Sequence, residues 1–243
     1  MSDDPAAAAR AISGEVQLTR ELLLSGALPA MLSKALPDVR LTTDAERAAS
    51  LAAMLASRPD PVDGVGDGVL VFAYGSLMWN PAIHVAERRM ARADGWHRSY
   101  CLSVKAGRGT PDNPGLMLGL RPGRDCVGAV LRVAEAHVEQ ELDLLWRREM
   151  VAEGYIPAWV PVFAPDGTRL GAAIAFTINP QGPSYCDPDE AEIVRRIATA
   201  RGGMGSSAEY LFRTRDALRA MGIHDPFVER IGDLVSAKLD AAV

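Results

Sequence analysis

The pattern of apolar and polar positions changes near residue 67. Before this point Ala and Leu recur at helical spacing, and Pro29 and Pro37 separate the helical segments. Residues 60–68, rich in Pro, Gly and Asp, have the composition of a linker. We therefore expect a helical extension with its linker over residues 1–67 and a main domain over residues 68–243.

One helix of the extension has clear end signals. Thr43 and Glu46 have the spacing of a capping box, in which both side chains bond to amides of the first turn. The helix should end near Arg58, because Pro59 cannot continue it. The extension either packs against the main domain, which we favour, or forms a contact between two copies of the chain.

After the linker the pattern becomes that of β-strands. Short apolar runs bounded by turn residues predict strands over residues 69–72, 116–120, 127–133, 158–163 and 172–178. Pro165, Asp166 and Gly167 form a turn signal between the last two runs. We expect those two strands to pair as a hairpin.

Helical periodicity returns between and after the strands. Helices are expected over residues 136–148, from residue 187, and over residues 208–221 and 226–242. Asp187 can cap its helix, and Pro188 suits the first helical position. Central strands with helices beside them indicate an α+β fold, and periodicity leaves open whether the sheet closes into a small barrel.

Composition and charge narrow the function classes. The 243 residues carry a net charge of −5 and no run of like charge, so nucleic acid is not expected as a partner. The three scattered cysteines predict neither a disulfide framework nor a zinc cluster, and their odd number fits a reducing compartment. The four histidines lack the spacing of metal ligands. Without a secretory signal or an apolar stretch of membrane-spanning length, we expect a cytoplasmic protein.

The first candidate for chemistry is the turn after the strand at residues 69–72. It contains Tyr74, Gly75 and Ser76. Successive backbone amides at such a turn can bind a carboxylate or a developing oxyanion. By itself the signal is weak, because a Gly-Ser pair after a strand is more often a plain turn.

Two charged side chains are further candidates. Glu149 follows Arg147 and Arg148 at the C-terminal end of the predicted helix, where the helix dipole disfavours a negative charge. A raised carboxyl pKa would suit a proton-transfer group, whereas the alternative is a solvated charge cluster. Arg108, in a loop dense in Gly and Pro, can bind a carboxylate, or the loop is simply a mobile surface segment.

Six short segments lie along the chain in an order typical of one known family: Phe72–Pro81, Gly95–Tyr100, Gly107–Thr110 with Pro114 and Gly115, Leu144–Met150, Gly154–Trp159 and Glu209–Phe212. Together they resemble the ChaC-type γ-glutamylcyclotransferases, closest to the bacterial branch of that family. The likeness covers roughly residues 43–240.

The resemblance implies a fold, an activity and a set of site residues. The fold would be a small, mixed or antiparallel β-barrel with flanking helices. The activity would be lyase-type cleavage of glutathione into 5-oxoproline and cysteinylglycine, with no metal or cofactor and with Glu149 as the general base and acid. The residues implied in substrate binding are Val71, Phe72, Ala73, Tyr74, Gly75, Ser76, Leu77, Arg108, Tyr155 and Tyr210.

The chain departs from the family pattern at two places. Ala73 replaces a glycine of the turn, which would strain the backbone if that position needed a positive φ. Because Ala73 lies within a predicted strand, we expect a modest effect. Ser206 and Ser207 stand where the family commonly has Asn, so hydrogen bonds near Tyr210 are expected to differ.

Two alternatives to glutathione cleavage remain open at this stage. The enzyme could act on other γ-glutamyl amino acids or on γ-glutamylamines. The chain could also be a non-catalytic glutathione-binding protein, although a binder has no need of a proton-transfer residue such as Glu149. The sequence does not indicate an oligomeric state.

Overall fold

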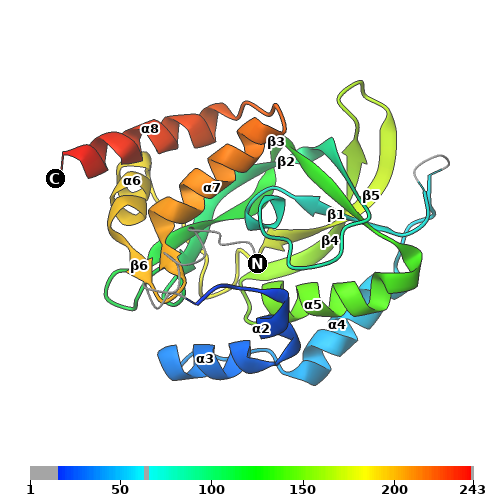
Figure 1. Cartoon of the computed structure of the whole chain (residues 1–243), viewed down its shortest axis with the longest axis horizontal. Coiled ribbons are helices and arrows are strands. Elements are labelled where there is room, and N and C mark those ends of the chain that lie inside the picture. The colour runs from blue at the N-terminus through cyan, green and yellow to red at the C-terminus, as the bar shows by residue number, and fades with distance from the viewer. Residues whose placement is uncertain (1–15, 63–65, 242–243) are drawn as a thin grey trace, which may run out of the picture.

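A closed five-stranded barrel forms the centre of the protein (Figure 1). The structure is a computed structural model that describes residues 16–62 and 66–241. The barrel order is β1-β3-β2-β4-β5, with antiparallel neighbours, and β5 closes the ring by pairing parallel to β1. The strands are β1 (Val69–Ala73), β2 (Glu87–Val104), β3 (Gly115–Val133), β4 (Tyr155–Phe163) and β5 (Arg169–Ile178). The expected α+β fold with a small mixed barrel is confirmed, as is the β4–β5 hairpin.

The hairpin of β2 and β3 differs most from the expected strands. The apolar pattern predicted no strand over β2, and it wrongly divided β3 into two. Residues 122–125 of β3 are exposed, so backbone pairing continues there without apolar side chains. In β2 the register shifts between Asp94 and Trp96, which breaks the alternation. Gly95 occupies this bulge with a φ of 83°, a conformation that L-residues rarely adopt.

The described part of the extension contains three helices: α2 (Arg20–Leu24), α3 (Ala27–Ala35) and α4 (Asp44–Ala56). The expected capping box is confirmed, because Thr43 Oγ1 accepts from the Glu46 amide and the Glu46 carboxylate accepts from the Thr43 amide. The helices are divided close to the Pro29 and Pro37 regions, as expected, but the first break falls at Ser25 and Gly26, before Pro29. Pro29 lies in the first turn of α3, where its missing N–H leaves no hydrogen bond unmade.

The extension packs against α5 (Val138–Glu149), the helix that follows the barrel strand β3 and the short 3₁₀ turn η2 (Glu135–His137). Two Arg20 nitrogens donate to the buried Glu141 carboxylate at 2.5 and 2.8 Å. Trp146 Nε1 donates to Ser50 Oγ at 3.1 Å, which joins α4 to the same helix. Figure 1 shows α2, α4 and α5 lying together beside the barrel.

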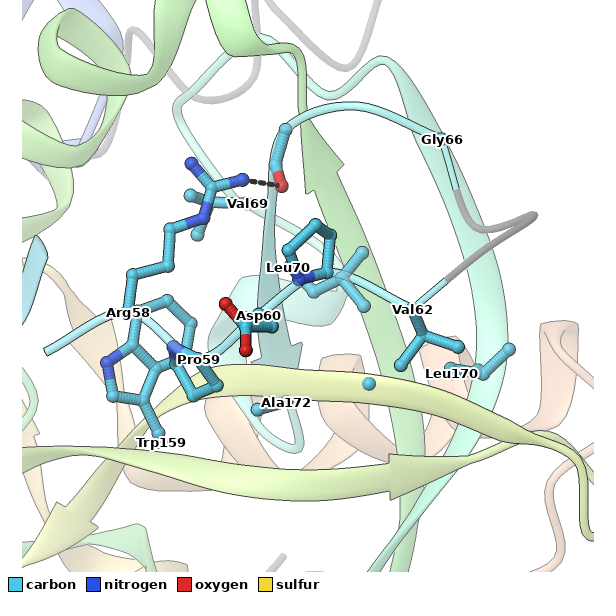
Figure 2. A pocket seen from close by; sticks show the side chains of 13 residues that line it. Arg58, Pro59, Asp60, Val62, Gly66, Val69, Leu70, Trp159, Leu170 and Ala172 are labelled. Carbon is cyan, nitrogen blue, oxygen red and sulfur yellow. Dashed lines mark hydrogen bonds between the residues drawn. The ribbon is translucent and has the colours of Figure 1, made fainter.

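The described residues of the linker, 60–62 and 66–68, lie beside β1 and β5 of the barrel. Arg58 donates to the carbonyl oxygen of Gly68 at 2.6 Å, and the side chain of Val62 lies beside Leu170 of β5 (Figure 2). A cavity of about 30 Å³ lies beneath it. A space of this volume has room for water molecules.

The remaining helices gather on another side of the barrel (Figure 1). They are α6 (Glu190–Thr199), α7 (Ser207–Ala220) and α8 (Pro226–Asp240), and a small β6–β7 ribbon (Arg201–Gly202 and Gly205–Ser206) precedes α7. The prediction that Asp187 caps α6 was wrong. The cap is Asp189, whose side chain accepts from the Glu192 amide, whereas Asp187 Oδ1 pairs with Arg121 Nη1 at 2.6 Å. Within residues 16–62 and 66–241, no helix combines the length and apolarity needed to cross a membrane.

The Arg20–Glu141 pair predicts that the extension stabilises the fold. Arg20→Ala leaves the Glu141 carboxylate buried without its cation. Because Arg20 itself is partly exposed, we expect a loss of about 3 kcal/mol in the free energy of unfolding, the low end for a broken buried pair. Urea denaturation measures this loss. The double variant Arg20→Ala/Glu141→Leu should recover most of it, since no unpaired charge remains. A single variant as stable as the parent protein would contradict this role.

Candidate active site

A narrow pocket opens where β1 ends. It is lined by side chains and backbone of Tyr74, Gly75, Ser76, Leu77, Leu118, Glu149, Tyr155, Phe176 and Tyr210, and its volume is about 20 Å³. These residues come from the turn after β1, from β3, β4 and β5, and from the helices α5 and α7. The barrel fold therefore brings together segments that lie far apart in the sequence.

Glu149 is the one acidic residue that lines this pocket. It is the last residue of α5, and its side chain is 12% exposed. Burial raises the pKa of Glu149, whereas the neighbouring Arg148 guanidinium opposes this rise. Arg148 Nε lies 2.7 Å from Glu149 Oε1, but the pair is not aligned as a hydrogen bond. The neutral form of this carboxyl group is therefore favoured more than in an exposed glutamate.

The end of α5 is fixed by Trp146, one turn before Glu149. Trp146 is fully buried, and its ring meets that of Phe176 edge to face with centroids 5.3 Å apart. Side chains three residues apart lie on the same helix face, so the packing of Trp146 also directs Glu149 toward the barrel. The contact between Trp146 and Phe176 therefore positions Glu149 through the helix and adds no charge beside its carboxyl group.

Three tyrosine hydroxyls lie at the pocket, and the backbone of Leu118 on β3 forms hydrogen bonds with two of them. Tyr155 Oη donates to the Leu118 carbonyl oxygen at 2.9 Å, and Tyr210 Oη accepts from the Leu118 amide at 3.4 Å. Tyr74 Oη donates to the Phe176 carbonyl oxygen at 2.6 Å. Burial raises the pKa of Tyr74 and Tyr155 well above the usual value and that of Tyr210 to about 12. All three therefore stay protonated at neutral pH, and the Tyr210 proton is not used by the Leu118 contact.

The turn after β1 approaches Tyr210 closely. A Cβ atom on Gly75 would lie 2.7 Å from Tyr210 Oη, so only glycine fits at this position. Ser76 begins the 3₁₀ turn η1 (Ser76–Met78), whose first amides lack intrahelical acceptors. Within the described residues, the amides of Gly75, Ser76 and Leu77 donate to no protein acceptor. They are free to bind an oxyanion or a carboxylate.

Arg148 links the helix to this turn. Its Nη2 donates to Ser76 Oγ at 2.8 Å, and its Nη1 donates to the Asn80 carbonyl oxygen. Only 5% of the side chain is exposed. One buried guanidinium therefore fixes the turn and also stabilises the ionised form of Glu149.

A wider compartment of about 430 Å³ adjoins the narrow pocket and shares Ser76 and Tyr210 with it. Its other lining residues include Val16–Arg20 of the extension, Trp79 after η1, Arg108 and Met117 of the β2–β3 hairpin region, and Met204, Glu209 and Arg213 near or on α7. A molecule bound at Glu149 can therefore extend past Ser76 and Tyr210 into this compartment.

The comparisons with known proteins agree with this geometry. The family described as ChaC-like protein matches residues 69–238. The chain belongs to this family. Among ChaC-like relatives, the glutathione-specific γ-glutamylcyclotransferase of Escherichia coli is 39% identical over 222 residues, which cover 91% of this chain and 92% of that protein. The human glutathione-specific γ-glutamylcyclotransferase 1 is 31% identical, covering 73% and 82% of the two chains.

A solved structure supports the ChaC-like fold. The crystal structure of a yeast γ-glutamylcyclotransferase specific to glutathione superimposes with a TM-score of 0.65 at 22% identity. The match covers 71% of this chain and 97% of the yeast chain. At this identity the likeness concerns the fold.

The structure places most of the predicted site residues in one pocket. Tyr74–Leu77, Glu149, Tyr155 and Tyr210 line it together. Val71, Phe72 and Ala73 do not line it, because their side chains are fully buried in the barrel core, and Arg108 lines the wider compartment instead. Leu118 and Phe176 were not predicted, since their backbone contacts to tyrosines leave no signal in an apolar strand.

Both departures from the ChaC-like pattern are accommodated. Among the residues that the structure covers, the one non-glycine with a positive φ is Ala82, so Ala73 is unstrained. Ser206 caps α7 by accepting from the Glu209 amide at 3.0 Å. Ser207 Oγ donates to the Arg108 carbonyl oxygen at 3.0 Å, which ties the Arg108 loop to α7.

The pKa shifts of two buried glutamates predict opposite effects on stability. The pKa of Glu149 is raised, so the folded state favours its neutral form and stability is lost as pH rises through that pKa. Glu149→Gln keeps the neutral shape, and its melting temperature at pH 8 should equal or exceed that of the parent.

Glu141 is the matched comparison for this melting experiment. Burial alone would raise the pKa of Glu141, but hydrogen bonds from Arg20 and the His84 amide lower it overall. The stability that it contributes is present above the ordinary carboxyl pKa and is lost in acid. Glu141→Gln should therefore melt lower than the parent at pH 8. If Glu149→Gln and Glu141→Gln lowered the melting temperature equally, the opposite pKa shifts given for the two glutamates would be contradicted.

Proposed function

We propose that this ChaC-like protein is a glutathione-specific γ-glutamylcyclotransferase that converts glutathione into 5-oxoproline and cysteinylglycine. The observation that carries the proposal is a nearly buried carboxyl group, Glu149, with a raised pKa in a pocket lined by protonated tyrosines and unpaired backbone amides. The printed names of the E. coli and human relatives support the same substrate.

Glu149 acts first as a base in the proposed reaction. The α-amine of the γ-glutamyl group is protonated at neutral pH and cannot attack until a proton leaves. Glu149 accepts that proton, and the freed amine forms a bond to the γ-carbonyl carbon, closing a five-membered ring. Because both reacting groups belong to one molecule, orientation in a narrow pocket supplies much of the rate.

Glu149 acts next as an acid. The tetrahedral intermediate collapses with cleavage of the bond between the γ-carbon and the cysteinyl nitrogen. Two protons leave the α-nitrogen in total and two are gained by the departing nitrogen, so Glu149 carries them one after the other. Water is not a reactant, and the step balances without a cofactor.

The polar groups around Glu149 serve binding and charge stabilisation. The amides of Gly75, Ser76 and Leu77 bind either the oxyanion of the intermediate or the α-carboxylate. The Tyr210 hydroxyl has a proton to donate to the same region, since its contact with Leu118 uses only the oxygen. These donors are fixed by the fold before substrate arrives, so little reorganisation accompanies the reaction.

We assign the catalytic domain to residues 68–243 and the helical extension and linker to residues 1–67. The family match over residues 69–238 supports this division. We also place the enzyme in the cytoplasm, because its cysteines are unpaired thiols, as is usual in a reducing compartment.

Glu149→Gln tests the proton-transfer role. Without an ionisable group both proton transfers fail, and we expect kcat for glutathione to fall by about 10²–10⁴-fold. Release of 5-oxoproline and cysteinylglycine, followed by mass spectrometry, measures the change. Glu153→Gln is the matched control, since this half-exposed carboxylate pairs with Arg40 outside the pocket. A folded Glu149→Gln variant with more than a tenth of the parent activity would exclude the role.

The pH dependence tests the environment of Glu149. Activity requires the ionised base, so kcat/KM should fall in acid with a midpoint above the ordinary value of 4.5. Arg148→Met removes the cation that lowers the pKa of Glu149 and should move this midpoint to higher pH. Arg147→Met is the control, because Arg147 pairs with Asp143. An unmoved midpoint in Arg148→Met would show that Glu149 does not determine the acid limb.

A further inference from the structure

The wider compartment beside the catalytic pocket carries an excess of positive charge. Its lining contains the guanidinium groups of Arg20, Arg108, Arg148 and Arg213 and a single carboxylate, Glu209. Arg20 is neutralised by Glu141, and Arg148 lies against Glu149. The other two arginines share Glu209, so one positive charge among these lining side chains is left over.

Arg108 and Arg213 differ in how firmly they are held. Arg108 Nη1 donates to the Ser206 carbonyl oxygen at 2.7 Å and to Glu209 Oε2 at 3.0 Å, and its side chain is 12% exposed. Arg213 Nη1 lies 3.3 Å from Glu209 Oε1, and its side chain is 40% exposed. Arg213 therefore keeps more of its N–H donors available for a ligand.

The ring of Trp79 lies near both guanidinium groups. The central carbon of Arg213 lies 4.2 Å from the Trp79 ring centroid, and that of Arg108 lies 5.8 Å from it. Trp79 is itself held by a hydrogen bond from Nε1 to Thr214 Oγ1 at 3.1 Å. A cation–π contact helps to hold a guanidinium in place, and its remaining N–H donors can bind a carboxylate.

The outer wall of the compartment comes from Val16–Arg20, which precedes the region matched by the family. Three contacts hold this segment. The Val16 amide donates to the Gly203 carbonyl oxygen at 2.8 Å, and Asn80 Nδ2 donates to the Leu18 carbonyl oxygen at 2.9 Å. The third contact is the pair between Arg20 and Glu141 described above. The extension thus contributes part of the lining of this compartment.

We propose that this compartment is a second substrate subsite that receives the cysteinylglycine half of glutathione, binds its terminal carboxylate through Arg213 with Arg108, and has residues 16–20 as its wall. The inference rests on the proposed function. It follows because the compartment adjoins the pocket at Glu149 and shares Ser76 and Tyr210 with it. The subsite selects substrates that carry a carboxylate at the far end of a dipeptide.

The test compares glutathione with its C-terminal amide, which lacks the terminal negative charge. The parent enzyme should have a kcat/KM for the amide about 10- to 100-fold below that for glutathione, as for loss of a charge-assisted hydrogen bond. Arg213→Gln should lower kcat/KM for glutathione to the level of the amide, mainly through KM, and leave the amide unchanged. Arg219→Gln, also on α7 but paired with Glu229, is the control.

The outcomes separate this inference from the proposed function. No 5-oxoproline from the parent enzyme with glutathione would refute the function itself. If the parent is active but treats the amide like glutathione, or if Arg213→Gln slows both substrates equally, the carboxylate subsite is wrong. The subsite is supported if the parent and Arg219→Gln prefer glutathione to the amide and Arg213→Gln does not.

Gln17, an exposed residue of the wall segment, tests the part played by the extension. Gln17→Glu should raise KM for glutathione by about two- to fivefold and Gln17→Lys should lower it, as expected for a partly screened charge near a carboxylate. KM for the amide should change little in either variant. Identical KM values for glutathione in all three proteins would overturn the assignment of residues 16–20 as the wall.

Discussion

The proposed catalytic site depends on one electrostatic balance, between the burial of the Glu149 carboxyl group and the positive charge of Arg148. Burial favours the neutral acid, and the adjacent guanidinium favours the ionised base. Burial is the larger effect, so the pKa is raised, and a carboxyl group of raised pKa suits the proposed proton transfers. The fold maintains the balance by anchoring α5 through Trp146, so that Glu149 reaches the barrel and remains largely out of water.

The barrel supplies the rest of the site through backbone groups that side-chain chemistry alone would not reveal. Leu118 is apolar, yet its amide and carbonyl hold Tyr210 and Tyr155. The turn at Gly75 passes so close to Tyr210 that no side chain fits. Three unpaired amides and three protonated phenols thereby surround a carboxyl group. The arrangement suits a reaction in which charge moves within one bound molecule and water is excluded.

Features that depend on neighbouring residues could be predicted from the sequence. Contacts between residues far apart in the sequence could not. The capping box at Thr43, the β4–β5 hairpin and the turn at Tyr74–Ser76 depend on neighbouring residues, and each was found. Strand β2 was missed because its bulge at Gly95 breaks the alternation of apolar positions. The position of Arg213 beside Trp79 was missed as well, since it arises only when α7 packs near η1. Glu149 was identified through family likeness, because its spacing alone also fits a surface charge cluster.

The most direct measurement is a titration of the Glu149 carboxyl group itself, by carbon-13 NMR of protein labelled at glutamate side chains, with Glu149→Gln to assign the signal. The account predicts a midpoint above the ordinary 4.5 that coincides with the acid limb of kcat/KM. A midpoint at or below 4.5 would mean that Arg148 outweighs burial. Glu149 would then be too weak a base for the role described, and the central claim would fail.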